Sequence, residues 1–159
     1  MKNLLLKLKG TPIVVACPVM KNNDNISMMA RSASCFGVKT FITTGQNKVD
    51  SHISRNCSID IQSHRSLLPV IKKYKEGGYR ILGIEQTKDS IPLSSYCFLN
   101  TPTLLVVGNE CSGMSQEVLN ELNDTIEIPL AGEPYSMNVA AALSICLYER
   151  SKQFGEVIK

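Results

Sequence analysis

The chain has 159 residues, which favours one domain over two, and a domain of that size buries roughly 70% of the surface that its unfolded chain exposes. Hydrophobic residues make up 43% of the chain and charged residues 19%, which excludes a disordered chain and a fibrous repeat. The 17 basic and 14 acidic residues give a net charge of +3, which neither requires nor excludes a nucleic-acid partner.

The six cysteines and two histidines do not form a recognisable ligand pattern. No cysteine pair has the Cys-x-x-Cys spacing, and His52 and His64 complete no zinc motif, so we expect no metal. Several cysteines lie in apolar runs, where a free thiol packs as a small hydrophobe. We therefore expect a reduced protein of the cytoplasm. No stretch of about 20 apolar residues is present, so we expect no membrane partner.

Short β-branched or aliphatic runs alternate with helical patterns along the chain. The runs lie at residues 13–16, 40–43, 80–84, 104–107 and 125–128; the helical patterns lie at 25–36, 66–76, 116–122 and 136–154. The run at 104–107 is continuously apolar, which is typical of a strand covered on both faces. This alternation predicts an α/β domain with a mostly parallel sheet flanked by helices. Ligands of such sheets bind at the loops that leave the carboxyl ends of the strands, and three of these loops are unusual.

The first unusual loop is the asparagine-rich segment 22–25, which opens a helix. An apolar stripe on that helix leaves Arg31 projecting from the opposite side. Taken alone, the pattern is also explained by an ordinary helix cap followed by a solvated arginine.

The second unusual loop, residues 108–113, follows the most apolar run. Gly108 and Gly113 bracket Glu110, and glycines allow the backbone to turn sharply and approach a ligand closely. An ordinary strand-to-helix turn explains the same residues. The spacing of a dinucleotide-binding loop and the lysine of a phosphate-binding loop are both absent.

The third unusual loop runs from residue 128 into the last helix. Ser136 is a suitable helix cap, but a cap at Ser136 leaves Asn138 unexplained, because asparagine is a poor helix former. The turns after Asn138 are apolar nearly all round, which indicates burial on more than one side. Because the helix lies near the end of a small domain, we expect one of those sides to contact a second subunit.

Together the three loops resemble the three motifs of the SpoU family of RNA 2′-O-ribose methyltransferases, part of the SPOUT superfamily. The resemblance covers residues 12–154, and residues 78–87 are similar to members that make 2′-O-methylguanosine in tRNA. The matching residues, motif by motif, are Asn25, Arg31, Ala33, Phe36 and Gly37; residues 104–110 and Gly113; and Ile128, Pro129, Gly132, Ser136, Met137, Asn138 and Val139.

The resemblance implies a single catalytic domain over residues 1–159, without a separate RNA-binding domain, whose parallel sheet ends in a C-terminal trefoil knot. Periodicity alone does not predict a knot, because knots are nearly absent from proteins. The resemblance also implies a homodimer packed through the C-terminal helix. Its implied cofactor is S-adenosylmethionine, bound by Gly108, Glu110, Ile128, Leu130, Gly132, Met137 and Asn138.

The same resemblance implies that the chain methylates a ribose 2′-hydroxyl, with RNA as partner. Guanosine in tRNA is favoured and rRNA is the alternative substrate. The catalytic residues that it implies are Arg31, Asn25, Glu110, Ser136 and Asn138. Guanidinium has a pKa above about 12, so we assign Arg31 to stabilising the developing alkoxide and gripping a phosphate, not to removing a proton.

Two other functions remain open at this point. The first is a non-catalytic RNA-binding protein of the same family, since Ser27 stands where the family usually has glycine. The second is a nucleotide-binding α/β module of the flavodoxin type.

Overall fold

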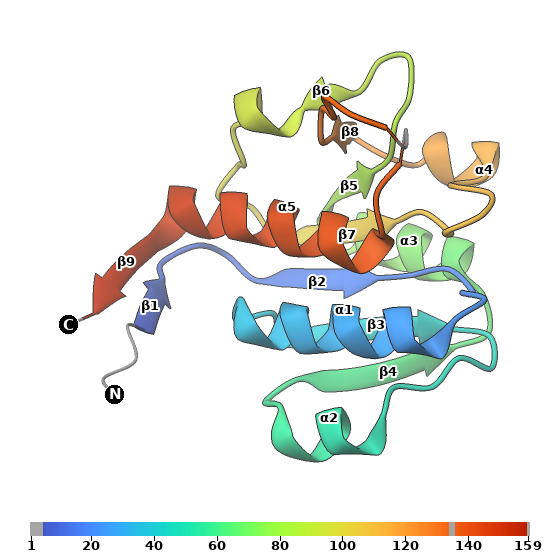
Figure 1. The fold of residues 1–159 in the computed structure, drawn as a ribbon, viewed down its shortest axis with the longest axis horizontal. Helices are drawn as coiled ribbons and strands as arrows, with labels where there is room; N and C mark the ends of the chain where they lie inside the picture. Colours follow the sequence, from blue (N-terminus) through green and yellow to red (C-terminus); the bar gives the residue numbers. More distant parts are fainter. Residues whose placement is uncertain (1–4, 134–135, 159) are drawn as a thin grey trace.

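A parallel seven-stranded sheet forms the centre of the protein, in a computed structural model that describes residues 5–133 and 136–158. The strand order is β4-β3-β2-β7-β5-β8-β6, and every neighbouring pair is parallel (Figure 1). The strands are β2 (Ile13–Ala16), β3 (Thr40–Thr44), β4 (Asp60–His64), β5 (Arg80–Ile84), β6 (Ile91–Pro92), β7 (Thr103–Val107) and β8 (Asp124–Glu127). The parallel α/β prediction is therefore confirmed, while the trefoil knot stays a prediction.

Helices cover both faces of the sheet. In Figure 1, α1 (Asn23–Cys35) and α5 (Val139–Phe154) lie in front of it and α3 (Leu67–Glu76) lies behind. Three short elements, α2 (Ser51–Asn56), α4 (Gln116–Leu119) and the 3-10 helix η1 (Leu93–Ser95), complete the layers. A two-stranded antiparallel ribbon, β1 (Leu5–Leu8) with β9 (Gly155–Ile158), projects from one end. No helix in the described ranges is long and apolar enough to cross a membrane.

Alternate side chains of the strands build two separate cores. On the α1 and α5 side, Val15, Phe41 and Leu105 are fully buried. On the α3 side, Ile42 and Leu104 are fully buried. All five residues of β7 are buried, because the strand lies in mid-sheet between both layers, which explains its continuously apolar sequence.

The last helix begins three residues later than the sequence pattern predicts. Asn138 is the N-cap of α5, because its Oδ1 accepts hydrogen bonds from the backbone N–H groups of Ala140 at 2.9 Å and Ala141 at 3.3 Å. The prediction that a helix starts at Ser136 is therefore wrong. The cap also explains why a poor helix former stands at position 138.

The helices α1 and α5 lie side by side and run in the same direction. Their contacts follow one another in register: Asn138 donates to Asn25, Ser144 donates to Ser32, and the rings of Tyr148 and Phe36 meet edge to face at 6.4 Å. This pairing brings the start of the first motif next to the end of the third.

Tyr96, Asp124 and Arg80 tie the segment after β6 to the sheet. The Tyr96 hydroxyl donates to Asp124 Oδ2 at 2.7 Å, and the Arg80 guanidinium donates to the same oxygen. Burial, followed by the hydrogen bond to Asp124, raises the pKa of Tyr96 to about 12.

Tyr96→Phe should lower the free energy of unfolding at pH 7 by about 1–2 kcal/mol, the range for a lost hydrogen bond. A neutral tyrosine with a raised folded pKa contributes its full stability below its ordinary pKa of about 10 and loses it as the pH rises towards 12. The two proteins should therefore converge in stability above pH 10, as measured by urea unfolding at a series of pH values. Parallel curves from pH 7 to 12 would show that the hydroxyl has no such role.

Candidate active site

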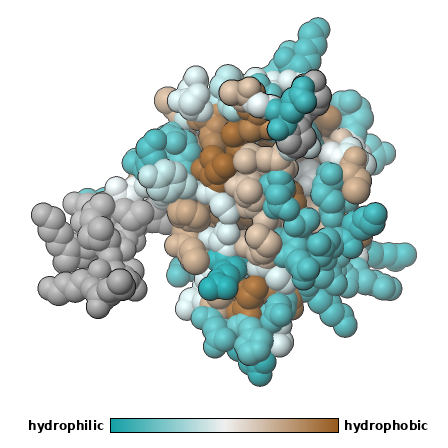
Figure 2. All heavy atoms as spheres, in the orientation of Figure 1, coloured by the Kyte–Doolittle hydropathy of each residue, from teal (hydrophilic) through white to brown (hydrophobic). Residues whose placement is uncertain are grey.

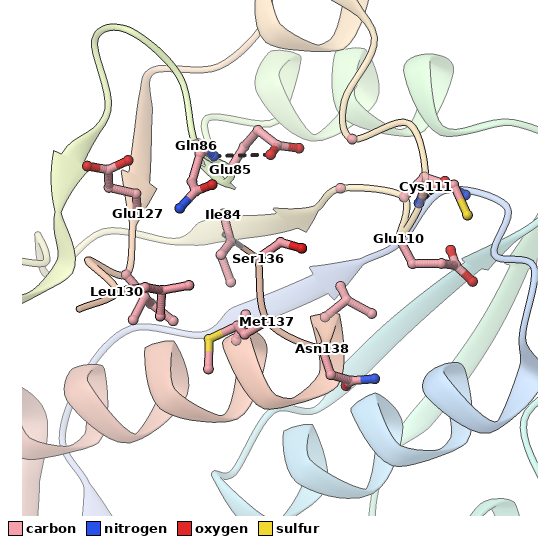
Figure 3. Close-up of a pocket in the computed structure, with 16 residues that line it drawn as sticks. Ile84, Glu85, Gln86, Glu110, Cys111, Glu127, Leu130, Ser136, Met137 and Asn138 are labelled. Carbon is pink, nitrogen blue, oxygen red and sulfur yellow. Dashed lines mark hydrogen bonds between the residues drawn. The ribbon is translucent and has the colours of Figure 1, made fainter. Parts of the chain in front are cut away.

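The second and third unusual loops line one pocket at the carboxyl edge of the sheet. Its volume is about 490 Å³, within the range of small-molecule sites (Figure 3). The lining residues are Ile84, Glu85, Gln86, Gly108, Asn109, Glu110, Cys111, Gly113, Glu127, Ile128, Leu130, Ser136, Met137, Asn138, Val139 and Ala142.

Six of the seven predicted cofactor residues belong to this lining, and Gly132 does not. Gly132 is exposed, and apart from its two chain neighbours no described residue has an atom within 4 Å of the place where its Cβ would be. Among the predicted catalytic residues, Glu110, Ser136 and Asn138 line the pocket, whereas Asn25 and Arg31 do not.

Glu110 joins the second loop to the first. Its Oε1 accepts hydrogen bonds from the backbone N–H groups of Lys21 at 2.8 Å and Asn22 at 3.0 Å, in the turn that leads into α1. In the same loop, Asn109 Nδ2 donates to the carbonyl of Val19 at 2.8 Å. The carboxylate of Glu110 thus holds a neighbouring loop in place as well as lining the pocket.

Asn138 joins the third loop to the first. While its Oδ1 caps α5, its Nδ2 donates to Asn25 Oδ1 at 2.9 Å. Asn25 therefore contacts Asn138, which lines the pocket, although Asn25 itself does not line it. All three motifs are linked by side-chain hydrogen bonds.

Arg31 is exposed on α1, on the side away from the buried stripe, as predicted. Its side chain makes no hydrogen bond or ion pair with any residue in 5–133 or 136–158, which leaves the guanidinium available to a ligand. Since Arg31 does not line the pocket, its predicted role concerns a ligand that extends beyond it.

Ser27 has a structural contact of its own. Its Oγ accepts a hydrogen bond from the backbone N–H of Asp50 at 2.9 Å, and Asp50 in turn caps α2. The serine that departs from the family pattern therefore faces the loop between β3 and α2. It does not line the pocket.

The pocket is acidic. Glu85, Glu110 and Glu127 contribute three carboxylates, and no lysine, arginine or histidine belongs to the described lining. Figure 3 shows the three carboxylates on different sides of the cavity, from the ends of β5 and β8 and from the loop after β7. Such a pocket favours a cationic ligand and disfavours a phosphate, which argues against the flavodoxin-type alternative.

Glu85 is a pocket residue that the motif pattern missed. It directly follows β5, so the general tendency of ligands to bind at the carboxyl ends of strands was the available signal. Its Oε2 accepts from the backbone N–H of Met114 at 3.0 Å, and its Oε1 accepts from that of Gln86 at 3.1 Å. The carboxylate therefore holds the far end of the second loop.

Glu85 also explains why the second loop needs its glycines. A Cβ on Gly108 would overlap Glu85 Oε2, and one on Gly113 would lie 2.8 Å from the same oxygen. Gly113 additionally has a φ of +66°, a region that other residues rarely adopt. The sequence predicted that these glycines allow a ligand to approach the backbone closely. In the structure, the carboxylate of Glu85 makes that close approach.

No group of three or more His, Cys, Asp or Glu side chains able to hold a metal ion occurs in the described part of the chain.

Cys17, at the end of β2, is buried, and burial together with the nearby charge of Glu110 raises its pKa to about 12.

The SpoU rRNA Methylase family matches residues 12–148, which include all three loops. The chain belongs to this family. It is 28% identical over 158 residues to the tRNA (guanosine(18)-2′-O)-methyltransferase of Aquifex aeolicus, an alignment that covers 96% of this chain and 74% of that enzyme.

Solved structures of the SpoU family have the same fold. The A. aeolicus TrmH/SpoU tRNA modifying enzyme matches with a TM-score of 0.80 and 28% identity, over 93% of this chain and 77% of that one. The SpoU methyltransferase AviRb of Streptomyces viridochromogenes, in complex with the cofactor AdoMet, matches with a TM-score of 0.75 and 23% identity, over 92% of this chain and 61% of that one. The latter likeness concerns the fold alone.

The contact between Glu85 and Gly108 predicts a non-additive pair of substitutions. Gly108→Ala should lower the free energy of unfolding by about 1–3 kcal/mol in the wild-type background, because the new methyl group displaces the carboxylate. In a Glu85→Ala background the same change should cost at least about 1 kcal/mol less. Chemical denaturation of the four proteins measures this coupling.

Gly132→Ala is the matched control, because within the described ranges only its chain neighbours lie within 4 Å of the added methyl group. Its effect on unfolding should be equal in the two backgrounds. Equal costs of Gly108→Ala with and without Glu85 would contradict the assigned role of the carboxylate.

Proposed function

We propose that the protein transfers the methyl group of S-adenosylmethionine to a ribose 2′-hydroxyl of RNA. The observation that carries the proposal is the acidic pocket, lined by the second and third motifs and hydrogen-bonded to the first. Its lining has the charge that a sulfonium and an ammonium group require.

The residues present fit this cofactor. The pocket combines its three carboxylates with apolar side chains, among them Ile84, Leu130 and Met137, that suit a heteroaromatic ring. The residues that would hold the cofactor are Gly108, Glu110, Ile128, Leu130, Met137 and Asn138, with Gly132 in the adjoining loop. When bound, S-adenosylmethionine supplies a methyl group already activated for displacement, so the chain needs to supply alignment and charge stabilisation.

The chain's own residues orient the hydroxyl and stabilise its charge. Asn138 and Asn25 hold each other in a fixed geometry at the rim, and the exposed Ser136 hydroxyl offers a donor and an acceptor beside them. As the ribose oxygen takes the methyl group from sulfur, the hydroxyl proton would pass to solvent water. The guanidinium of Arg31, which has no partner among the described residues, would donate to the ribose oxygen and to the neighbouring phosphate. A phosphate itself is repelled from the acidic pocket, so the RNA presents its ribose there.

The proposed substrate is tRNA, with guanosine as the modified nucleoside and rRNA as the alternative. The A. aeolicus relative, a tRNA (guanosine(18)-2′-O)-methyltransferase, supports tRNA, whereas the name of the SpoU rRNA Methylase family supports rRNA. The 2′-hydroxyl restricts the reaction to RNA in either case.

The proposal extends to organisation and location. We place a trefoil knot in the C-terminal part of a single catalytic domain, supported by the fold likeness to the A. aeolicus enzyme. The cytoplasm is the proposed compartment, since the six cysteines are free and a reducing compartment keeps thiols in that state.

We also propose a homodimer through the face that α1 and α5 form. Met28 on α1 and Ile145 and Tyr148 on α5 are large apolar residues that remain exposed, with exposed fractions of 55%, 39% and 55%. Figure 2 shows apolar residues over the middle of this face. A second copy would cover these side chains.

Arg31→Ala should leave the melting temperature and the affinity for S-adenosylmethionine near wild type, because the side chain has no partner in the described structure and lies outside the pocket. Transfer of methyl groups to unmodified tRNA should fall by about a hundredfold, the scale of a lost transition-state donor. Arg31→Lys should restore little of this activity, since a point charge does not reproduce the planar fork. Calorimetry and incorporation of radiolabelled methyl groups measure the two quantities.

Arg55→Ala, an exposed arginine on α2, is the control and should transfer at the wild-type rate. A chelator should leave the cofactor affinity unchanged. If Arg31→Ala keeps wild-type transfer, the role of Arg31 is wrong; if the wild type modifies neither tRNA nor rRNA, a non-catalytic RNA-binding function takes its place.

Tyr148→Glu should convert the dimer into a folded monomer, because it places an unpaired carboxylate in the proposed interface while Tyr148 is exposed in the single chain. Leu143→Glu is the contrasting variant: Leu143 is fully buried within the single chain, so the fold itself should be lost. Sedimentation and circular dichroism separate the two effects. A wild-type monomer at micromolar concentration would exclude the dimer.

A further inference from the structure

A second cavity, of about 610 Å³, lies on the opposite side of the sheet from α1 and α5, between β4 and α3. We call it the α3 groove. It shares no residue with the acidic pocket, and its charge is opposite: Arg65 and Lys73 contribute cations, and no aspartate or glutamate lines it.

The two cations of the α3 groove have no other partner. Neither the Arg65 nor the Lys73 side chain makes a hydrogen bond or ion pair within the described residues. Lys75, two residues later, differs in this respect, since its ammonium pairs with Glu121 at 3.0 Å. The groove therefore presents two unpaired cations to an incoming ligand, while a carboxylate just outside the lining, Asp60, accepts a hydrogen bond from Gln62 at 2.6 Å.

Aromatic rings form part of the same wall. Tyr74 and Tyr79 both line the groove and meet edge to face, with ring centroids 4.8 Å apart. Proteins bind single-stranded RNA with such a combination of cations and aromatic rings, because cations attract phosphates and rings stack on bases.

One end of the groove, at Arg65, lies where an RNA bound at the acidic pocket can reach it, whereas Tyr79, which directly precedes β5, is at the opposite, amino edge of the sheet. Arg65 directly follows β4, so it is at the carboxyl edge of the parallel sheet, the same edge as Gly108 and Glu110. Between β7 and β4 lie three inter-strand spacings, which is about 15 Å.

We propose that the α3 groove binds a single-stranded segment of the substrate RNA, which enters at Arg65 and runs along α3 towards the amino edge of the sheet. This inference rests on the proposed function, since it assigns a docking surface to the same substrate. The acidic pocket repels phosphates, so the groove supplies the phosphate contacts that the pocket lacks, while Tyr74 and Tyr79 take a base.

Charge reversal at one cation on α3 and at one in the loop after β4 tests the groove. Lys73→Glu and Arg65→Glu should each weaken binding of fluorescently labelled, unmodified tRNA transcripts by tenfold or more at 0.15 M salt. Each should also make the slope of log affinity against log salt concentration shallower by about 0.7, the value for one lost phosphate contact on a single strand. The affinity for S-adenosylmethionine and the melting temperature should stay at wild-type values.

Lys72→Glu is the matched control, since Lys72 is exposed on the same helix, next to Lys73, and does not line the groove. It changes the net charge equally and should weaken RNA binding by less than about threefold, because a side chain outside the lining makes no direct phosphate contact in the groove. Equal losses for Lys72→Glu and Lys73→Glu would overturn the groove in favour of a general effect of charge.

The failure of the groove and that of the proposed function are distinguishable. A wild type that methylates tRNA while Lys73→Glu and Arg65→Glu bind it normally overturns the groove alone. A wild type that neither binds nor methylates RNA overturns both. Dissociation of a wild-type dimer by these two variants, with RNA binding unchanged, overturns the proposal by assigning the groove to a second copy.

Discussion

One carboxylate holds together the parts of the chain on which the candidate site depends. Glu110 accepts two backbone N–H groups from Lys21 and Asn22, which precede it by 89 and 88 residues. Hydrogen bonds to an ionised acceptor are among the stronger ones in proteins, and loss of the carboxylate would leave both donors unsatisfied. The start of α1, and with it the positions of Asn25 and Arg31, therefore follows from the loop after β7.

The acidic pocket and the basic α3 groove have opposite charges, and the proposals assign them different ligands: the cofactor to the pocket and RNA phosphates to the groove. A site for a cationic cofactor needs negative charge, and the same charge disfavours the phosphates that flank every ribose. A catalytic domain of this kind must obtain its RNA affinity elsewhere on its surface, and Arg31, Arg65 and Lys73 are cations without a protein partner in the described structure. In the proposed arrangement these cations lie outside the pocket, Arg31 on α1 and the other two along the α3 groove.

The sequence predicted the parallel sheet and most of the pocket, since both depend on local patterns. The apolar run of β7 and the loops after β7 and β8 were recognised because their residue types are unusual for their positions. The edge strand β4 and the short helix α2 were missed: Asp60–His64 buries no residue completely, and six residues give too little periodicity. Glu85 was missed because its contacts with Gly108 and Met114 exist only once β5 and β7 are paired.

Helix boundaries needed the tertiary structure as well. Ser136 and Asn138 are both suitable caps by residue type, and the choice between them depends on Asn25, which holds the amide of Asn138 from a helix far away in the sequence. The exposed position of Arg31 followed from helical periodicity. The separation of Arg31 from the pocket lining could not be predicted from periodicity, because it depends on how α1 packs beside α5.

The position of β7 in the sheet has a consequence for the newly made chain. β7 fills the gap between β2 and β5, both of which precede it in the sequence. Until the ribosome has delivered residues 103–107, the apolar strand β2 has an open edge on that side, and open edges are templates for pairing with other chains. At ordinary rates of synthesis this interval lasts on the order of ten seconds. The central strand that makes the finished sheet continuous thus leaves the nascent chain exposed to aggregation for most of its synthesis.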